Sequence, residues 1–496
     1  MRIREILIVT MGLLWLGDVY GQSKSRLEFE IRPNEPQPEI VPIEKLGIIV
    51  FNPAREKKED GLSSITFAFY NTEFEKVWEK NVITNKKLNL NFYEYFENAF
   101  YLIFNNRNKE SLEVVKINPA TAVIDNYKFF VVKGTEIKDF VVKNDQVVIG
   151  GAIKNTPLIQ QIDLNTKKTK TLPSIVEGKS VAVQEVFINA KTNAISAVIS
   201  STFDKNKNVI IRTYRQNPSK FDDLVITSNK KFDFHTAKVT SLDAGIKLVL
   251  GSYGYRKNAN TQGFYIAKFI DDNQEFLQFY SFTELDNFFS FLNDREKVKI
   301  ENKAERKKQK GKDLKINYRL LTHELVSQGD QYVMIGEAYY PVYRTERFMD
   351  YFGYRRYYNY QTVFDGNQFT HAVIAGFSKS GDLMWDHSFK INDIKTRALN
   401  EKVKAYVEPE DITLFYNLEG NINKLTIRSN KVDNSEETLT LATEYQNDQV
   451  KRADIGSAEY WYDNYFIAWG YQKIKNLDNL EVKKKRNIFY INKMSF

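Results

Sequence analysis

Residues 137–173 read IKDFVVKNDQVVIGGAIKNTPLIQQIDLNTKKTKTLP, and this stretch decides the fold. Runs rich in Val and Ile alternate with breaks at Asn144-Asp145, Asn155-Thr156 and Asn165-Thr166. Such residue pairs are typical of tight turns between antiparallel strands. Four short strands in about 37 residues have the size of one four-stranded blade of a β-propeller.

Similar units recur along the rest of the chain, each a set of short apolar runs separated by turns of Asn, Asp, Lys and Gly. They occupy residues 47–82, 88–132, 183–228, 232–282, 320–389, 403–441 and 455–496. The second run of each unit is the most apolar, as in QVVIGGAIK and IKLVLGSYG. A continuous apolar run suits a strand buried on both faces between neighbouring blades.

These eight units predict an all-β fold, a β-propeller over residues 47–496 with one helical insertion. We expect the first and last units to share one blade, because pairing of strands from both termini commonly closes a propeller ring. This gives about seven four-stranded blades, with six and eight as the alternatives. An array of β-sandwiches is the competing fold, but the absence of compositional linkers between units favours one ring.

The N-terminus has the pattern of a secretory signal peptide. Arg2 and Arg4 precede an apolar run at residues 6–16, and Val19 and Gly21 stand where a signal peptidase reads the chain. An uncleaved membrane anchor is the alternative, but this run spans only about half of the ~30 Å hydrocarbon core. We therefore expect residues 1–21 to be a signal peptide.

Residues 22–46 contain four prolines and predict an extended segment or a strand that docks late. The sequence has no cysteine, so a lipid anchor at the cleavage site is excluded. A chain of this length can bury a large core without disulfides. We expect a periplasmic protein, with an extracellular location as the alternative, and no transmembrane span in the mature chain.

The formal net charge of +8 arises from 71 basic and 63 acidic residues, a modest excess typical of a solvated surface. Export also argues against nucleic acid as a partner. The sequence has no strong sign of a homo-oligomer.

Residues 283–313 break the strand pattern. Thr283 and Asp286 form a candidate cap ahead of an apolar stripe with helical spacing. The stripe consists of Leu285, Phe288, Phe289 and Leu292. A charged run with nine basic residues follows from Asp294 to Asp313. We expect a helical insertion that leaves the ring, with contact to acidic lipids or an acidic partner as the alternative to a solvated helix.

Residues 338–366 form a second excursion, between two strands that a short turn would ordinarily join. It is rich in Tyr and Arg, the residue types enriched at protein interfaces. The predicted partner-binding residues are Tyr340, Tyr343, Arg344, Arg347, Tyr351, Tyr354, Arg355, Arg356, Tyr357 and Tyr358. Local burial of these rings against their own blade and a carbohydrate-stacking platform are the alternatives.

No catalytic motif is found in the sequence. The four histidines form no HxH or HExxH pattern, and there is no GxSxG, P-loop or GxGxxG motif. They are His235, His323, His371 and His387. We predict no catalytic residue, no metal ligand and no cofactor.

Two segments rich in side-chain oxygens are candidates for a calcium loop or a catalytic pair. Residues 204–208 carry oxygen-bearing side chains at alternate positions, but two lysines and the missing bidentate Glu favour a hairpin turn over a calcium loop. Glu408, Glu410 and Asp411 leave open a pair of glycosidase carboxylates.

Residues 376–386, GFSKSGDLMWD, resemble the strand–turn–strand of bacterial secreted β-propellers, in which a G-x-x-x-W-D-like turn leads into the outer strand. The resemblance implies that Gly381 opens the turn and that Trp385 packs on the neighbouring strand. In size, signal peptide, missing cysteine and Tyr-rich excursion, the chain is also similar to the periplasmic plug-like accessory proteins of the type IX secretion translocon. Those proteins cap the periplasmic mouth of a large outer-membrane barrel. The last run, residues 487–496, is expected to close the ring, with no separate sorting domain after it.

We therefore expect a non-enzymatic periplasmic propeller that binds a membrane-protein complex, with an outer-membrane barrel or its complex as partner. This protein would plug or regulate an outer-membrane protein-secretion translocon. The alternatives are a secreted glycan hydrolase or lyase with carboxylates in the central funnel, and a carbohydrate-binding propeller.

Overall fold

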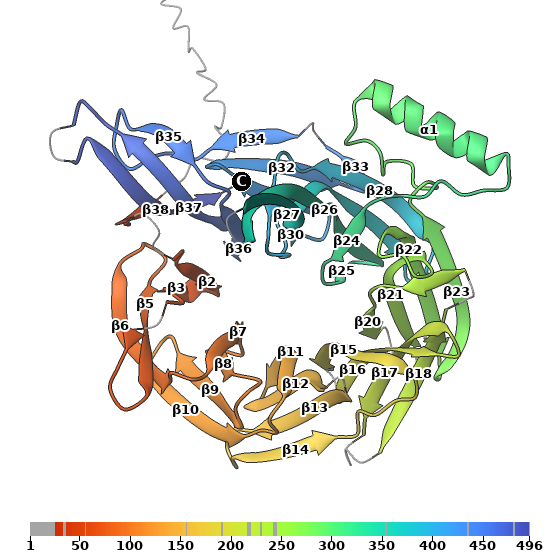
Figure 1. Cartoon of the computed structure of the whole chain (residues 1–496), viewed down its shortest axis with the longest axis horizontal. Coiled ribbons are helices and arrows are strands. Elements are labelled where there is room, and N and C mark those ends of the chain that lie inside the picture. Colours follow the sequence, from red (N-terminus) through yellow and green to blue (C-terminus); the bar gives the residue numbers. More distant parts are fainter. Residues whose placement is uncertain are drawn as a thin grey trace, which may run out of the picture.

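The computed structural model describes residues 25–495 with short gaps. The gaps are residues 33–35, 55, 155, 190–191, 216–219, 229–230, 242–245, 353–354, 434–435 and 480–481. The expected signal peptide lies outside the described residues. Within them, eight antiparallel sheets stand as blades around a central opening (Figure 1). The all-β propeller prediction is confirmed.

The first four blades follow one another in chain order. Blade 1 contains β2 (Glu39–Ile43), β3 (Gly47–Phe51), β4 (Glu56–Lys57), β5 (Leu62–Tyr70) and β6 (Lys76–Asn85), with the short helix η1 (Glu44–Leu46). Blade 2 contains β7 (Asn89–Phe96), β8 (Ala99–Asn105), β9 (Ser111–Asn118) and β10 (Val123–Phe130). Blade 3 contains β11 (Thr135–Lys143), β12 (Gln146–Ile153), β13 (Thr156–Asp163) and β14 (Lys168–Leu172). Blade 4 contains β15 (Lys179–Ile188), β16 (Ile195–Phe203), β17 (Asn206–Tyr214) and β18 (Phe221–Thr227).

The other four blades carry the insertions and the ring closure. Blade 5 contains β19 (Phe232–Phe234), β20 (Lys238–Ser241), β21 (Ile246–Tyr255), β22 (Thr261–Ile270) and β23 (Asn273–Ser281), followed by the helix α1 (Asp294–Lys308). Blade 6 contains β24 (Arg319–Thr322), β25 (Val326–Gln328), β26 (Gln331–Phe352), β27 (Arg355–Ser378), β28 (Leu383–Lys390) and β29 (Lys395–Thr396). Blade 7 contains β30 (Lys404–Val407), β31 (Asp411–Leu418), β32 (Asn421–Arg428), β33 (Lys431–Val432) and β34 (Glu437–Thr440). Blade 8 contains β35 (Gln449–Ala453), β36 (Ser457–Tyr462), β37 (Tyr465–Lys475), β38 (Lys485–Ser495) and, from the N-terminal segment, β1 (Ser25–Glu30).

The described residues form eight blades, the highest of the three predicted counts. The expected sharing of a blade between the two termini holds only for β1, which pairs with β38 in an antiparallel register from Ser25↔Lys493 to Glu30↔Ile488. The unit that begins at Gly47 forms its own sheet because β2 supplies its edge strand, pairing with β3. The N-terminal segment thus contributes one strand to each of two blades.

The apolar core is divided among the blades. Eight buried clusters lie between successive sheets, and the cluster between blades 8 and 1 closes the ring around Trp461 and Trp469. The indole N–H of Trp461 donates to the carbonyl of Gly47 at 2.9 Å. The second strand of each unit is predicted to be buried on both faces. In β16, for example, every residue from Ile195 to Ser201 is buried. Each blade is therefore stabilised mainly by its two neighbours.

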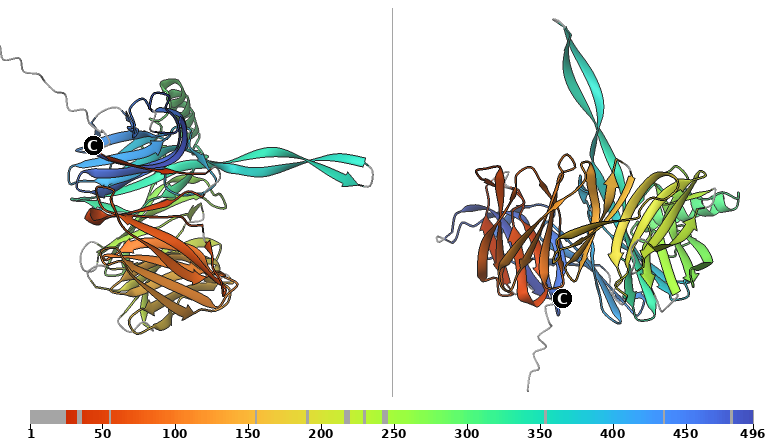
Figure 2. Two further views of the ribbon diagram at one scale, coloured as in Figure 1. Left: turned by 90° about the vertical axis from the view of Figure 1, so that its left-hand side faces the viewer. Right: turned by 90° about the horizontal axis from the view of Figure 1, so that it is seen from below.

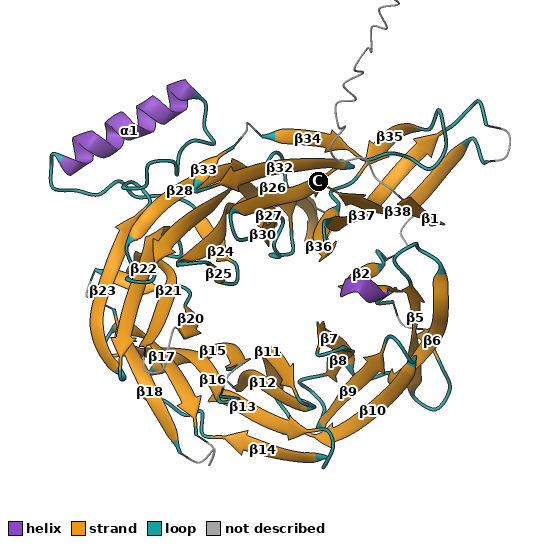
Figure 3. Cartoon of the chain, turned by 180° about the vertical axis from the view of Figure 1, so that it is seen from behind, coloured by secondary structure: helices purple, strands orange, loops and turns teal. Residues whose placement is uncertain are grey.

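The helix of the first insertion begins at Asp294, later than the cap predicted at Thr283 and Asp286. Asn293 is the actual cap, and its side chain accepts the backbone N–H of Glu296 at 3.0 Å. The predicted stripe lies in turns instead, and three of its members are buried between blades 5 and 6. Asp386 accepts the backbone N–H groups of Asp286 and Asn287 at 2.9 and 2.8 Å, so these groups are satisfied without a helix. Figure 3 shows α1 outside the ring, with strands in every blade.

The turn that carried the resemblance to secreted propellers has the expected geometry. Gly381 has a φ of +97°, a conformation that L side chains rarely adopt. The indole of Trp385 packs over Gly376 of β27, where an added Cβ would lie 2.2 Å from the ring. The residue pair Asp204-Lys205 forms the two-residue turn between β16 and β17, with positive φ at both positions.

Candidate functional site

The Tyr-rich excursion is formed by the distal halves of β26 and β27. These strands continue as a two-stranded ribbon beyond the blade, and the ribbon projects away from the ring (Figure 2). We call residues 343–364 the arm. From Tyr343 to Phe352 it extends about 30 Å at ~3.3 Å per residue.

A β-bulge marks the base of the arm. Val342 pairs with Gly366 and Tyr343 with Phe364, so Asp365 is the extra residue. Its carboxylate lies 2.7 Å from the ammonium of Lys395 and 3.4 Å from the guanidinium of Arg344. Lys395 holds the pKa of Asp365 below its usual range, through a hydrogen bond and its charge. These ion pairs attach the arm to blade 6 at the point where it leaves the ring.

One face of the arm is aromatic. Residues directly opposite in an antiparallel pair share a face, and Tyr343↔Phe364, Arg347↔Tyr360 and Met349↔Tyr358 are such pairs. We call these six side chains the aromatic face. The five apolar or aromatic members are between 39% and 69% exposed. The guanidinium of Arg347 lies 3.4 Å from the ring centroid of Tyr358, and the rings of Tyr343 and Phe364 are 5.9 Å apart.

The opposite face of the arm is mainly polar. It contains the pairs Arg344↔Val363, Glu346↔Gln361 and Phe348↔Asn359. Arg344 and Glu346 form an ion pair on this face. The arm is thus two-sided, and the described aromatic rings lie in solvent instead of packing on blade 6. For these rings, burial against their own blade does not occur.

The ten predicted partner-binding residues fall into three groups. Tyr343, Arg347 and Tyr358 lie on the aromatic face, Arg344 lies on the polar face, and Tyr340 lies at the base of the arm, 39% exposed. A second group is placed by backbone alone, with side chains outside the described residues: Tyr351, Arg355, Arg356 and Tyr357. Tyr354 lies outside the described residues altogether. The aromatic face also contains Met349, Tyr360 and Phe364, which are not among the ten.

The innermost strands of the blades, among them β15, β20, β30 and β36, line the central opening (Figure 1). Charged residues of these strands form a second group. Lys238 of β20 lies 3.2 Å from Glu185 of blade 4 and also pairs with Glu324 of blade 6. Lys404 of β30 lies 3.3 Å from Glu459 of blade 8. These ion pairs link neighbouring blades at the centre of the ring.

The carboxyl groups at the centre have altered proton affinities. Burial raises the pKa of Glu185 to about 7; the neighbouring Lys238 acts in the opposite direction and Glu324 raises it further. Burial likewise raises the pKa of Asp139 of β11 and of Glu459. Glu185 is therefore able to exchange a proton near neutral pH. Sequence reasoning missed this group because its members lie about one blade apart in the chain. The available signal was a charged residue within the innermost strand of several units.

The four histidines all have local partners. His323 lies 2.8 Å from Glu337, a buried carboxylate that also accepts the backbone N–H groups of Lys402 and Val403. His235 contacts the carbonyl of Asn258, and His387 that of Asn430. These contacts tie loops to blades.

His371 is fully buried and stacks on Phe291, with ring centroids 3.7 Å apart. In the part of the chain that the structure describes, no three His, Asp or Glu side chains gather as a metal-ion site.

The acidic residues near position 410 take part in a turn. Asp411 pairs with Arg428 on the neighbouring strand β32, and the backbone N–H of Glu408 donates to the carbonyl of Asp411. Among the described residues, no helix combines the length and apolar character needed to cross a bilayer.

Neither a protein-family model nor a curated protein matches this chain. Solved structures similar to it include the polysaccharide lyase Uly1, at 8% identity and a TM-score of 0.40 over 81% of this chain and 89% of the lyase. A protein from Lactobacillus plantarum is similar at 10% identity and a TM-score of 0.39 over 79% of this chain and 96% of that chain. The β-propeller domain of the Trilobed protease from Pyrococcus furiosus is similar at 10% identity and a TM-score of 0.35 over 78% of this chain and 93% of the domain. Likenesses of this size concern the fold alone.

Proposed function

We propose that this chain is an exported, non-enzymatic β-propeller that binds a membrane-protein complex through the arm. The observation that carries the proposal is the aromatic face, a row of exposed rings and one arginine on a ribbon outside the ring. Exposed apolar patches of this kind mark interaction sites, and Tyr and Arg dominate the binding energy of many interfaces.

The geometry of the arm suits insertion into a partner. A ribbon about 30 Å long reaches well beyond the blades, so it can enter a groove or lumen while the ring stays outside. Its cross-strand pairs fix the aromatic face without help from the ring.

The proposal that the partner is a membrane protein rests on the amino-acid sequence. The signal-peptide pattern at residues 1–21 supports export, and the similarity to plug-like accessory proteins supports a type IX secretion translocon in the outer membrane as the complex. A periplasmic location follows from the same proposal.

The test is a shortened arm. Thr345 and Thr362 are directly opposite, so residues 346–361 can be replaced by Asn-Gly, which closes a two-residue hairpin in the same register. The tagged full chain and this variant are purified in mild detergent from the organism that encodes them, and the co-purified proteins are identified by mass spectrometry. We expect a stoichiometric membrane-protein partner with the full chain and its loss with the variant. Equal recovery of the partner by both would overturn the proposal.

One observation favours a second candidate, a secreted glycan hydrolase or lyase. A glycoside hydrolase needs a carboxyl group that is protonated near neutral pH beside an ionised one, and the raised pKa of Glu185 supports the first role. A glycan panel incubated with the wild-type chain and with Glu185→Gln tests this candidate. Cleavage that disappears in the variant supports it, and absence of cleavage by the wild-type chain rejects it.

A further inference from the structure

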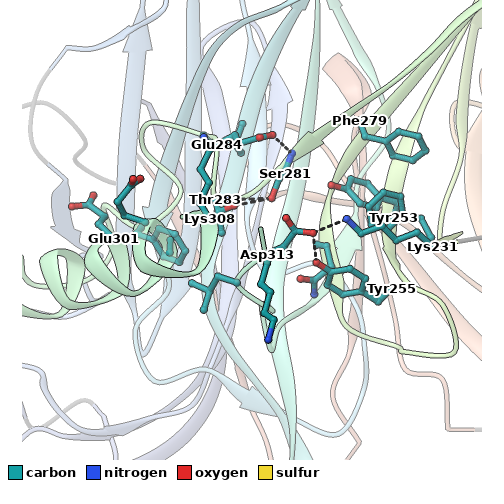
Figure 4. A pocket seen from close by; sticks show the side chains of 18 of the residues that line it. Lys231, Tyr253, Tyr255, Phe279, Ser281, Thr283, Glu284, Glu301, Lys308 and Asp313 are labelled. Atoms are coloured by element: carbon teal, nitrogen blue, oxygen red, sulfur yellow. Dashed lines mark hydrogen bonds and ion pairs between the residues drawn. The ribbon is translucent and has the colours of Figure 1, made fainter. Parts of the chain in front are cut away.

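A cavity of about 500 Å³ lies between α1 and the end of blade 5 (Figure 4). Its size falls within the range of small-molecule sites. One wall comes from β19, β21 and β23, and the other from α1 and the segments that join it to the ring. The helix wall of the cavity belongs to the insertion between blades 5 and 6.

The blade wall is aromatic. Its rings are Phe232, Tyr253, Tyr255 and Phe279. The ring centroid of Phe232 lies 4.7 Å from that of Tyr253 and 5.2 Å from that of Phe279. These contacts fix the wall before a ligand arrives, which lowers the entropic cost of binding.

The edge of this wall is fixed by polar contacts. The hydroxyl of Tyr255 donates to Asp313 at 2.8 Å, and the ammonium of Lys231 lies 2.7 Å from the same carboxylate. The hydrogen bonds from Lys231 and Tyr255 hold the pKa of Asp313 below its usual range. Asp313 therefore anchors the segment after α1 to blade 5.

The helix wall carries both signs of charge. Glu301, Ala304, Glu305 and Lys308 line the cavity from α1, at spacings that place them on one helical face. Ala304 leaves space at the middle of this face, between side chains that accept and donate hydrogen bonds. Lys308 and Lys312 make no ion pair or side-chain hydrogen bond with another described residue. Glu301 lies 3.9 Å from Lys297, and Glu305 accepts a hydrogen bond from Gln309 at 3.3 Å. Each carboxylate keeps further lone pairs, so donors and acceptors both remain for a ligand.

We propose that this cavity binds a neutral oligosaccharide. A pyranose ring offers an apolar C–H face to an aromatic wall, and its hydroxyls both donate and accept hydrogen bonds. Carboxylates at Glu301 and Glu305 accept from such hydroxyls, and ammonium groups at Lys308 and Lys312 donate to them. A ligand with a strong positive or negative charge is repelled by the side chains of the same sign on this wall, whereas a neutral ligand is not. The site is separate from the arm, and the inference does not depend on the proposed function.

The test fills the cavity with a side chain. Ala304→Trp places an indole in the space between the two walls. Lys303→Trp is the matched control, because it introduces the same side chain at the adjacent, exposed position of the same helix. Saturation-transfer NMR measures binding of cellotetraose, chitotetraose and maltotetraose to the mature wild-type chain and to both variants. The tripeptide Ala-Lys-Ala is the comparison ligand.

We expect at least one tetrasaccharide to bind the wild-type chain and Lys303→Trp, and Ala304→Trp to bind it at least about tenfold more weakly. Failure of all three tetrasaccharides to bind the wild-type chain would overturn the proposal, and so would equal binding by Ala304→Trp. Binding of Ala-Lys-Ala alone, abolished by Ala304→Trp, would assign the cavity to peptides and also overturn it.

Discussion

Strands β26 and β27 each pass through two environments, and the two halves of the same hairpin differ in almost every respect. Inside blade 6, Val333, Ile335 and Ile374 are buried on the face that packs against blade 7. Beyond Gly366 the same two strands expose aromatic rings on one face and polar groups on the other. The two strands stay paired through both halves, interrupted only by two bulges, so burial is the main difference between the halves.

This difference shows where stability and recognition reside. The inner half is stabilised by apolar burial, which tolerates little change. The outer half is stabilised by cross-strand pairs such as Arg347 with Tyr358, and its surface is free to be shaped by a partner. A substitution should therefore affect folding or binding according to the half in which it lies.

The largest expected effect is the difference in stability between a substitution in the inner half of the hairpin and one in the outer half. Ile374→Ala removes a fully buried side chain between blades and should lower the free energy of unfolding by about 2–5 kcal/mol. Tyr360→Ala removes a ring that is 69% exposed and should change it by less than about 0.5 kcal/mol. Denaturant unfolding followed by circular dichroism measures both. A large loss with Tyr360→Ala would mean that the arm contributes to the stability of the ring, contrary to this comparison.

Much of this architecture could be predicted from the sequence. Residues 137–173 form the predicted four strands because their turns and apolar runs agree with each other. The described residues form eight blades, the upper alternative to the favoured seven. Seven was favoured because β2, in a segment with four prolines, carries too little apolar pattern to be recognised as the edge of a separate blade. The stripe from Leu285 to Leu292 has helical spacing, but the carboxylate of Asp386, about a hundred residues away, satisfies its backbone instead.

Together, the arm and the charged group at the centre of the ring were predicted only in part. The excess of Tyr and Arg locates the arm, since residues of these types rarely accumulate without a use. The sequence does not say which of them share a face, because the bulge at Asp365 shifts the register by one residue, and such a shift moves every later side chain to the other face. The charged group at the centre of the ring was not predicted, because the packing of three successive blades brings Glu185 and Glu324 to the same lysine.

The second prediction concerns the two faces of the arm. Tyr358→Ser with Tyr360→Ser removes two rings of the aromatic face and should weaken partner binding about 10- to 100-fold. Asn359→Ser with Gln361→Ser changes neighbouring positions on the polar face of the same strand and should leave binding within about twofold. Titration of the purified partner measures both affinities. Equal losses from the two pairs would show that recognition does not distinguish the faces.

The smallest expected effect lies at the junction between the halves, where His371 pairs with Ala338. Burial lowers the pKa of His371 to about 3, so the ring stays neutral in the folded chain at pH values where it is protonated in the unfolded chain. The unfolded state therefore binds one more proton below a pH of about 6.5, the ordinary pKa of histidine. The stability linked to His371 is fully present above that pH and is lost as the pH falls toward 3, with a slope of about 1.4 kcal/mol per pH unit.

His371→Leu should remove this contribution, so that the free energy of unfolding of the variant falls less steeply between pH 6 and pH 4 than that of the wild-type chain, by about 1.4 kcal/mol per pH unit. The comparison of slopes is needed because burial also lowers the pKa of His235, to about 4, and His235 is present in both chains. Deuterium exchange at the imidazole C2 position, followed by mass spectrometry, gives the pKa of His371 in the folded wild-type chain without a substitution. Identical slopes, or an imidazole that titrates near 6.5 in the folded chain, would show that water reaches the junction and that the buried half of the hairpin ends before His371.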